Sequence, residues 1–214
     1  MKKVIIIFAL MFLSGQAWAS EVGNLPAESA LQKLMQGNER FVNSKMEHPN
    51  QTQARRGDLV KSQHPFAVIL CCSDSRVPPE IIFDRGLGDL FVIRNAGEVD
   101  DEHVLGSVEY AVEHLGVNLV VVLGHKSCGA VGAAMTGEKD LSAIESIKKS
   151  IKPACNKCKE DHDYTYDHVI KENTRMVAKE IAKHKDLVEY TKKRGMKIVP
   201  AYYDLDTGKV EILQ

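Results

Sequence analysis

The sequence predicts an α/β fold with a central, mainly parallel β-sheet flanked by helices. Three short apolar runs, 66–71, 90–93 and 119–123, are rich in Val and Ile and show no polar alternation, which is typical of strands buried on both faces. Helical stretches separate these runs, as the crossovers between parallel strands require. With 214 residues, the chain is long enough for one domain with its own core.

The segments before the first strand are predicted to be helical. Residues 26–45 place Ala30, Leu34 and Phe41 at helical spacing, and 51–62 forms a second helical stretch. We expect the first of these helices to form an N-terminal arm.

The segments after the second strand continue the alternation of helix and strand. The expected elements are a crossover helix over 101–115, short helices over 128–135 and 141–151, an exposed loop over 153–167, a helix over 169–189, and strands over 197–203 and 209–213. Asp206, Thr207 and Gly208 supply the turn between the last two strands. The C-terminal strand is therefore expected to return antiparallel.

The first nineteen residues are predicted to be a secretory signal peptide. Lys2 and Lys3 precede an apolar run over 4–13, and Ala17 and Ala19 give the small-x-small pattern of a cleavage site. The alternative is a membrane anchor, but ten apolar residues are short of the roughly 20 that a spanning helix needs. We expect a periplasmic protein without a membrane segment, its single domain covering 20–214.

The charge balance limits the classes of partner. Lys and Arg number 28 against 29 Asp and Glu, which gives a net charge of −1. Such a chain has no positive field to attract nucleic acid or anionic lipid. A small, uncharged or mildly anionic substrate fits this balance better.

Metal-ligating residues follow two of the predicted buried strands. Cys72 ends the run over 66–71, and His125 and Cys128 follow the run over 119–123. Ligands bind beyond the carboxyl ends of parallel strands, where these three side chains can converge. Two thiolates and one imidazole suit tetrahedral Zn²⁺ and leave a fourth position open, as in catalytic zinc sites. The alternative is two ordinary buried cysteines and a capping histidine.

Asp74 and Arg76 follow the first cysteine at a spacing that suits an ion pair. The planar fork of Arg76 can hold the Asp74 carboxylate through two hydrogen bonds. Held in this way, Asp74 stays ionised and can orient a zinc-bound hydroxide. Released, it can become a fourth zinc ligand, and the bland alternative is a surface ion pair.

These motifs resemble the beta-class carbonic anhydrases. The resemblance is carried by Cys72-Ser73-Asp74-Ser75-Arg76, by Arg94-Asn95-Ala96-Gly97 and by Gly124-His125-x-x-Cys128-Gly129. It implies one Zn²⁺ per chain on Cys72, His125 and Cys128, with Asp74 and Arg76 as a catalytic dyad. The implied reaction is the reversible hydration of CO₂ to bicarbonate and a proton, through attack by zinc-bound hydroxide.

The same resemblance places three further residues around the substrate and implies an oligomer. Gln63, Phe91 and Tyr110 would line the pocket, partly across the interface of a homodimer or tetramer, and the arm over 26–45 would reach onto a partner. By residue type alone, each of the three has an ordinary structural role. An apolar wall from Phe91 nevertheless suits CO₂, and the amide of Gln63 suits bicarbonate.

Two other functions remain open at this stage. One is a noncatalytic zinc-binding protein in which Asp74 permanently fills the fourth position. The other is a zinc hydrolase that acts on a different small heterocumulene, such as CS₂ or COS. The dyad of Asp74 and Arg76 favours turnover over storage, because zinc storage does not require an arginine that pulls a ligand away.

Three cysteines and one glutamate are left over. Cys71 is expected to face away from Cys72 as a buried apolar side chain. Cys155 and Cys158 have three interpretations: a local disulfide, a redox motif, or a second metal site together with His162. Glu98 stands where many members of the resembled family have Asn, and sequence alone assigns it no role.

Overall fold

The centre of the molecule is a five-stranded sheet in the order β2-β1-β3-β4-β5. The computed structural model describes residues 25–214, so the predicted signal segment lies outside the described residues. The strands are β1 (Ala67–Cys72), β2 (Leu90–Asn95), β3 (Leu119–His125), β4 (Lys197–Tyr203) and β5 (Val210–Ile212). The first four are mutually parallel, and β5 returns antiparallel beside β4. The predicted α/β fold class is confirmed.

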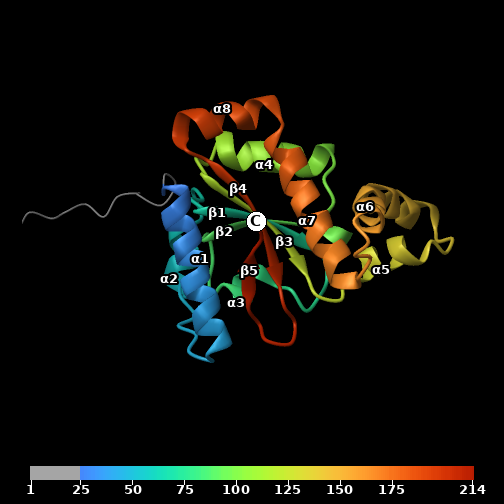
Figure 1. Cartoon of the computed structure of the whole chain (residues 1–214). Coiled ribbons are helices and arrows are strands. Elements are labelled where there is room, and N and C mark those ends of the chain that lie inside the picture. The colour runs from blue at the N-terminus through green and yellow to red at the C-terminus, as the bar shows by residue number, and fades with distance from the viewer. Residues whose placement is uncertain (1–24) are drawn as a thin grey trace, which may run out of the picture.

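Helices cover both faces of this sheet. In chain order they are α1 (Ala27–Val42), α2 (Gln53–Asp58), α3 (Pro79–Ile82), the 3₁₀ turn η2 (Ala96–Glu98), α4 (Glu102–Glu113), α5 (Gly129–Thr136), α6 (Ser142–Glu160), α7 (Tyr166–Ala182) and α8 (Lys185–Arg194). Figure 1 shows α1 on one side of the sheet and α4, α7 and α8 on the other, with α5 and α6 set to one side. No helix within 25–214 combines the length and apolarity needed to cross a bilayer.

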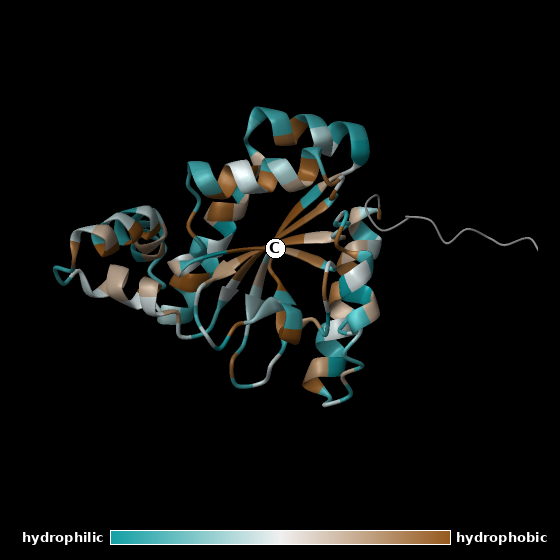
Figure 2. Cartoon of the chain, turned by 180° about the vertical axis from the view of Figure 1, so that it is seen from behind, coloured by the Kyte–Doolittle hydropathy of each residue, from teal (hydrophilic) through white to brown (hydrophobic). Residues whose placement is uncertain are grey.

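Burial on both faces explains the unbroken apolar runs. Every residue of β1 and β3 is buried. In β1, Ile69 and Cys71 pack into the core under α1, whereas Val68 and Leu70 pack into the core under α4, α7 and α8. The strands in Figure 2 are accordingly hydrophobic, and the outer turns of the helices are hydrophilic. Cys71 thus faces away from Cys72, as predicted.

The predicted N-terminal arm, α1, packs against its own sheet. Ala30 and Leu34 are fully buried in the core with β1 and β3. The amide of the buried Asn38 donates to the carbonyls of Ile82 and Gly208, and its oxygen accepts from the backbone N–H of Val210. These bonds join α1 to the start of β5.

The prediction of an exposed loop over 153–167 is wrong for residues 153–160, because α6 continues to Glu160. Cys155 and Cys158 are fully buried on this helix, in one apolar stripe with Ile151 and Ala154. The stripe has helical spacing, so the sequence contained the signal, and the polar residues around it obscured it. Pro153 is accommodated within the helix.

The helix predicted over 169–189 is in fact two helices. The chain breaks between Ala182 and Lys185, so that α7 and α8 pack separately. α8 then ends at Gly195, whose left-handed φ of 65° turns the chain toward β4. Both helices contribute to the core on the α4 side of the sheet.

Candidate metal centre

Two of the predicted metal ligands lie at the carboxyl ends of neighbouring strands. Cys72 is the last residue of β1, and His125 is the last residue of β3. β1 and β3 are hydrogen-bonded parallel neighbours, with Cys71 level with Leu123. Cys128 stands three residues beyond His125, as the residue that precedes α5. The topology therefore brings these three residues together.

The ligand atoms of Cys72, His125 and Cys128 form a tight and buried group. All three atoms lie within 4.8 Å of one another, and the two sulfurs are 4.0 Å apart. Tetrahedral zinc with Zn–S bonds of about 2.3 Å would separate two sulfurs by about 3.8 Å. The donor set and its spacing therefore fit Zn²⁺.

The imidazole of His125 is oriented for coordination through Nε2. Its Nδ1 lies 2.9 Å from the carbonyl oxygen of Lys126, to which a protonated Nδ1 donates. Nε2 is buried and has no hydrogen-bond partner in the described structure. Metal-ligating histidines typically have their other ring nitrogen fixed by such an acceptor. An unpartnered buried nitrogen is costly unless it binds an ion.

Negative charge at the centre is concentrated on Cys72. The pKa of the Cys72 thiol is lowered, chiefly because the Cys128 thiol donates a hydrogen bond to its sulfur. The backbone N–H of Gly97 also donates to Cys72 Sγ, at 3.4 Å. The same pairing, together with burial, raises the pKa of Cys128. Thiolate sulfur is the form that binds metal.

Asp74 and Arg76 form the predicted ion pair beside this group. Asp74 Oδ1 accepts from Arg76 Nε at 2.9 Å, and Oδ2 accepts from Nη2 at 2.7 Å. Arg76 lowers the pKa of Asp74 to about 2, chiefly through these side-chain hydrogen bonds. Asp74 Oδ2 lies 3.9 Å from His125 Nε2, but Asp74 is not part of the ligand group. The carboxylate is therefore ionised and directed at Arg76.

Two residues with no assigned role in the sequence analysis hold the ligand loops. Arg94 donates from Nε to the carbonyl of Cys72 at 3.1 Å and from Nη2 to the carbonyl of Asp74 at 2.7 Å. Tyr166, at the start of α7, donates its hydroxyl to the carbonyl of Cys128 at 2.6 Å. An arginine directly after the apolar run over 90–93 was a visible signal for Arg94. Nothing local marked Tyr166, because only the tertiary fold brings α7 to this loop.

The three predicted substrate residues lie away from the ligand group within one chain. Phe91 and Tyr110 are neighbours, with ring centroids 6.2 Å apart. Phe91 is level with Val68 in the sheet, four residues before the end of β1, or about 13 Å along the strand from Cys72. Gln63 is exposed on the segment between α2 and β1. The metal ligands converge, whereas Phe91 and Tyr110 lie together on the β2 side of the sheet.

Cys155 and Cys158, for which a disulfide, a redox motif and a second metal site were the interpretations, lie about one turn apart on α6. Both thiols are free and buried. Within 25–214, the group of Cys72, His125 and Cys128 is the only one that brings three or more metal-ligating side chains together. Helical residues three apart have Cβ atoms about 5–6 Å apart, farther than the roughly 3.8 Å of a disulfide. Burial also raises the pKa of the Cys158 thiol to about 11.

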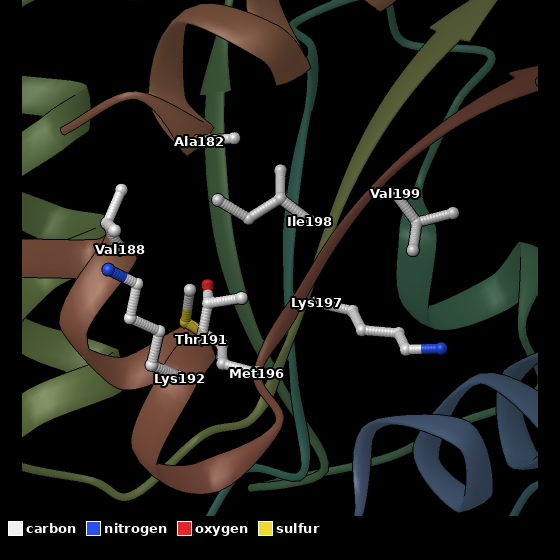
Figure 3. Close-up of a pocket in the computed structure, with 8 residues that line it drawn as sticks. All are labelled: Ala182, Val188, Thr191, Lys192, Met196, Lys197, Ile198 and Val199. Carbon is white, nitrogen blue, oxygen red and sulfur yellow. The ribbon is translucent and has the colours of Figure 1, made fainter.

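A groove elsewhere on the molecule is unrelated to the centre. It has a volume of about 360 Å³ and lies between α8 and the first residues of β4, lined by Met196, Ile198 and Lys192 among others (Figure 3). β4 is parallel to β3, and its first residue is level with Leu119. The groove therefore lies beyond the amino ends of the parallel strands, whereas His125 lies at their carboxyl ends.

The fold and the site define an α/β protein with a mainly parallel sheet and a Cys-His-Cys group that can hold a metal. The profile of the carbonic anhydrase family matches residues 67–210. This chain therefore belongs to the carbonic anhydrase family, and its fold is that of the beta class.

Among curated relatives, carbonic anhydrase 2 of Mycobacterium tuberculosis is 56% identical over 112 residues, which cover 52% of this chain and 54% of the relative. The carbonic anhydrase of Mycolicibacterium smegmatis is 48% identical over 130 residues, or 59% and 63% of the two chains. The match thus spans about half to two thirds of the length of these relatives.

Solved structures show the same fold over most of the chain. The beta-carbonic anhydrase CafA of Aspergillus fumigatus superposes with a TM-score of 0.71 at 27% identity, over 87% of this chain and 90% of that one. A tetrameric beta-carbonic anhydrase of Sordaria macrospora gives 0.72 at 22% identity, over 86% and 97%.

Proposed function

We propose that this protein is a zinc-dependent carbonic anhydrase, which converts CO₂ and water reversibly to bicarbonate and a proton by attack of zinc-bound hydroxide. One observation carries the proposal. The ligand atoms of Cys72, His125 and Cys128 form a buried group beside an ionised Asp74 that Arg76 holds outside the group. The names and folds of the relatives support the same activity.

Zinc, one ion per chain, is the metal that this donor set favours. Two thiolates and an imidazole are soft and intermediate ligands, which favour zinc over the oxygen-seeking Mg²⁺ and Ca²⁺. When bound, zinc supplies an acidified water as the nucleophile at neutral to alkaline pH. Two thiolates also neutralise much of the charge of the ion, so activity should favour alkaline pH.

Asp74 and Arg76 provide the polar part of the site. An ionised carboxylate only accepts hydrogen bonds, so Asp74 can accept one from a hydroxyl group next to His125 Nε2 and fix its orientation. Arg76 keeps the carboxylate ionised and aimed, and it also donates from Nη2 to the carbonyl of Ser127 at 3.2 Å. Because the Arg76 side chain is 52% exposed, the ion pair is only weakly stabilising. Asp74 can therefore leave Arg76 at small cost and act as a fourth ligand.

The substrate wall is proposed to be completed by a second copy of the chain. Phe91 and Tyr110 lie on the β2 side, and Tyr110 is 46% exposed. β2 is an edge strand, and it is less buried than β1 and β3. A homodimer or tetramer that covers this edge would bring Gln63, Phe91 and Tyr110 of one subunit toward the metal centre of another.

Export to the periplasm is part of the proposal and rests on the sequence of residues 1–19 alone. The two lysines, the ten-residue apolar run and the Ala17-Trp18-Ala19 pattern support a cleavable signal. The mature chain would then be 20–214, a soluble enzyme without nucleic-acid partners.

The deciding experiment is stopped-flow CO₂ hydration by zinc-loaded residues 20–214, from pH 6.5 to 9. We expect turnover that rises with pH, is abolished by metal removal and returns with one zinc per chain. A chain that binds one zinc and is inactive at every pH would support the noncatalytic alternative. Turnover of COS or CS₂ without CO₂ hydration would support the alternative hydrolase. A chain that binds no zinc would overturn the metal assignment itself.

A further inference from the structure

Glu98 is a buried acid that forms no ion pair with the residues of 25–214. It is 0% exposed, at the end of η2, and its φ of 40° lies in the left-handed region that non-glycine residues rarely adopt. Its Oε1 lies 3.4 Å from both Asn173 Nδ2 and Thr174 Oγ1 on α7. Its Oε2 is buried and has no hydrogen-bond partner. A strained backbone and a buried carboxyl are both costly, so they call for a function.

The Glu98 side chain lies between the loops that carry two metal ligands. On one side, Asn173 Nδ2 also donates to the carbonyl of Gly97 at 3.1 Å, and the N–H of Gly97 donates to Cys72 Sγ. On the other side is Gly124, the residue before His125. A Cβ at Gly124 would lie 2.1 Å from Thr174 Oγ1 and 3.3 Å from Glu98 Oε1. The cluster therefore fits closely against the backbone on both sides.

The side-chain hydrogen bonds that reach Glu98 come from α7. The Asn173 amide and the Thr174 hydroxyl both face Oε1 as donors, and the same hydroxyl lies 2.9 Å from the carbonyl of Ile170. These contacts tie the Glu98 carboxyl to α7 and fix its place against Gly97 and Gly124.

We propose that Glu98, together with Asn173 and Thr174, positions Cys72 and His125 for the metal, through shape and hydrogen bonding. Glu98 touches no reacting atom and is a positioning residue. The inference rests on the proposed function only in requiring that the Cys-His-Cys group binds zinc. It assigns α7 a role in the metal centre, in addition to its role in the core.

The test is the rate at which zinc-loaded protein releases zinc to a chromogenic chelator, measured for Glu98→Ala and Glu98→Gln. Supporting residues of metal ligands change metal affinity by about 10- to 100-fold. We expect Glu98→Ala to release zinc at least about tenfold faster than the wild type. Glu98→Gln keeps the shape and the acceptor oxygen, so its release rate should stay within about threefold of the wild type.

A matched control separates positioning from general destabilisation. Asp89 is also a buried carboxyl, but it lies just before β2, at the opposite end of the parallel strands from the metal ligands. It accepts hydrogen bonds from the Asn50 amide and from the backbone N–H of Gly86. Asp89→Ala should lower the melting temperature and leave zinc release unchanged. The Co²⁺-substituted proteins add a spectroscopic readout, because a shifted ligand field in Glu98→Ala alone indicates altered ligand geometry.

The outcomes separate the two proposals. Wild-type release kinetics in folded Glu98→Ala, or equally fast release from Glu98→Gln, would overturn the positioning role as stated. Should Glu98→Ala fail to fold, Asn173→Ala removes the bonds to Gly97 and Glu98 and must show the faster release in its place. A wild-type protein that holds no zinc would instead refute the proposed function.

Discussion

The metal centre and the β2 edge differ in how completely one chain builds them. The centre has three buried ligand atoms within 4.8 Å of one another, and hydrogen bonds from Gly97, Arg94 and Tyr166 reach the ligand residues. At the β2 edge, by contrast, Phe91 is half-buried and Tyr110 is exposed, and Gln63, on the segment before β1, is exposed as well. One chain thus brings the candidate metal ligands together, whereas the proposed substrate residues stay partly exposed.

This difference follows from the physics of the two regions. Cys72 and His125 stand at the ends of adjacent parallel strands, so backbone pairing within one chain places them side by side. A wall at an edge strand has one covered face and one open side, which another chain can complete. The predictions below test this contrast, from the largest expected effect to the smallest.

Removal of a ligand should abolish the centre. Cys72→Ser should lose bound zinc and reduce CO₂ hydration by more than about 100-fold, because a hydroxyl is a poor replacement for a thiolate. Metal content and stopped-flow rates measure both effects. The matched control is Cys71→Ala, one residue earlier on the same strand but in the opposite core. It should keep zinc and activity, and equal zinc loss in both variants would contradict the ligand assignment.

Removal of the dyad should separate catalysis from metal binding. Asp74→Asn should keep one zinc per chain and lower kcat/KM by about 100-fold, in line with the usual contribution of a proton-accepting side chain. The control is Asp206→Asn, which also loses an ion pair near the site, with Lys126 at 2.6 Å. It should show wild-type rates. Zinc loss in Asp74→Asn would instead make Asp74 a permanent ligand and support the noncatalytic alternative.

Activity should depend on contact between subunits at the β2 edge, whereas zinc binding should not. Tyr110→Ala should lower kcat/KM for CO₂ several-fold, and wild-type specific activity should fall on dilution below the dissociation constant of the oligomer, while zinc content stays constant. Tyr190→Ala, an aromatic truncation on α8, should leave kcat/KM unchanged. Sedimentation at the assay concentrations gives the oligomeric state. A fully active monomer would show that one chain completes the site.

Most of the fold and the ligand set could be predicted because their signals are local. Unbroken Val- and Ile-rich runs define β1 and β3, and Cys72 and His125 stand at the ends of those runs. α6 was mispredicted past residue 151, because the polar residues around Cys155 and Cys158 outweighed its apolar stripe. The supports of the centre could not be predicted, since Tyr166 and Asn173 reach it only through the packing of α7.

The smallest expected effect is a pH dependence of stability that comes from Glu98, the buried acid between the two ligand loops. Burial raises the pKa of Glu98 from 4.5 to about 8, so between these values the folded chain holds a proton that the unfolded chain has released. Stability therefore falls as pH rises through this window, by at most about 1.4 kcal/mol per pH unit. Glu98→Gln has no such proton, so its free energy of unfolding relative to the wild type should increase from pH 5 to pH 8.

Urea unfolding of the zinc-loaded proteins at several pH values measures this difference. The release of zinc on unfolding affects both proteins alike and cancels in the comparison. Bound zinc also neutralises the Cys72 charge, which removes one of the lesser causes of the raised pKa of Glu98, but burial remains. Parallel stability profiles for the two proteins would mean that Glu98 is ionised in the folded chain. Glu98 would then place a negative charge beside the metal ligands, which the metal ion must offset.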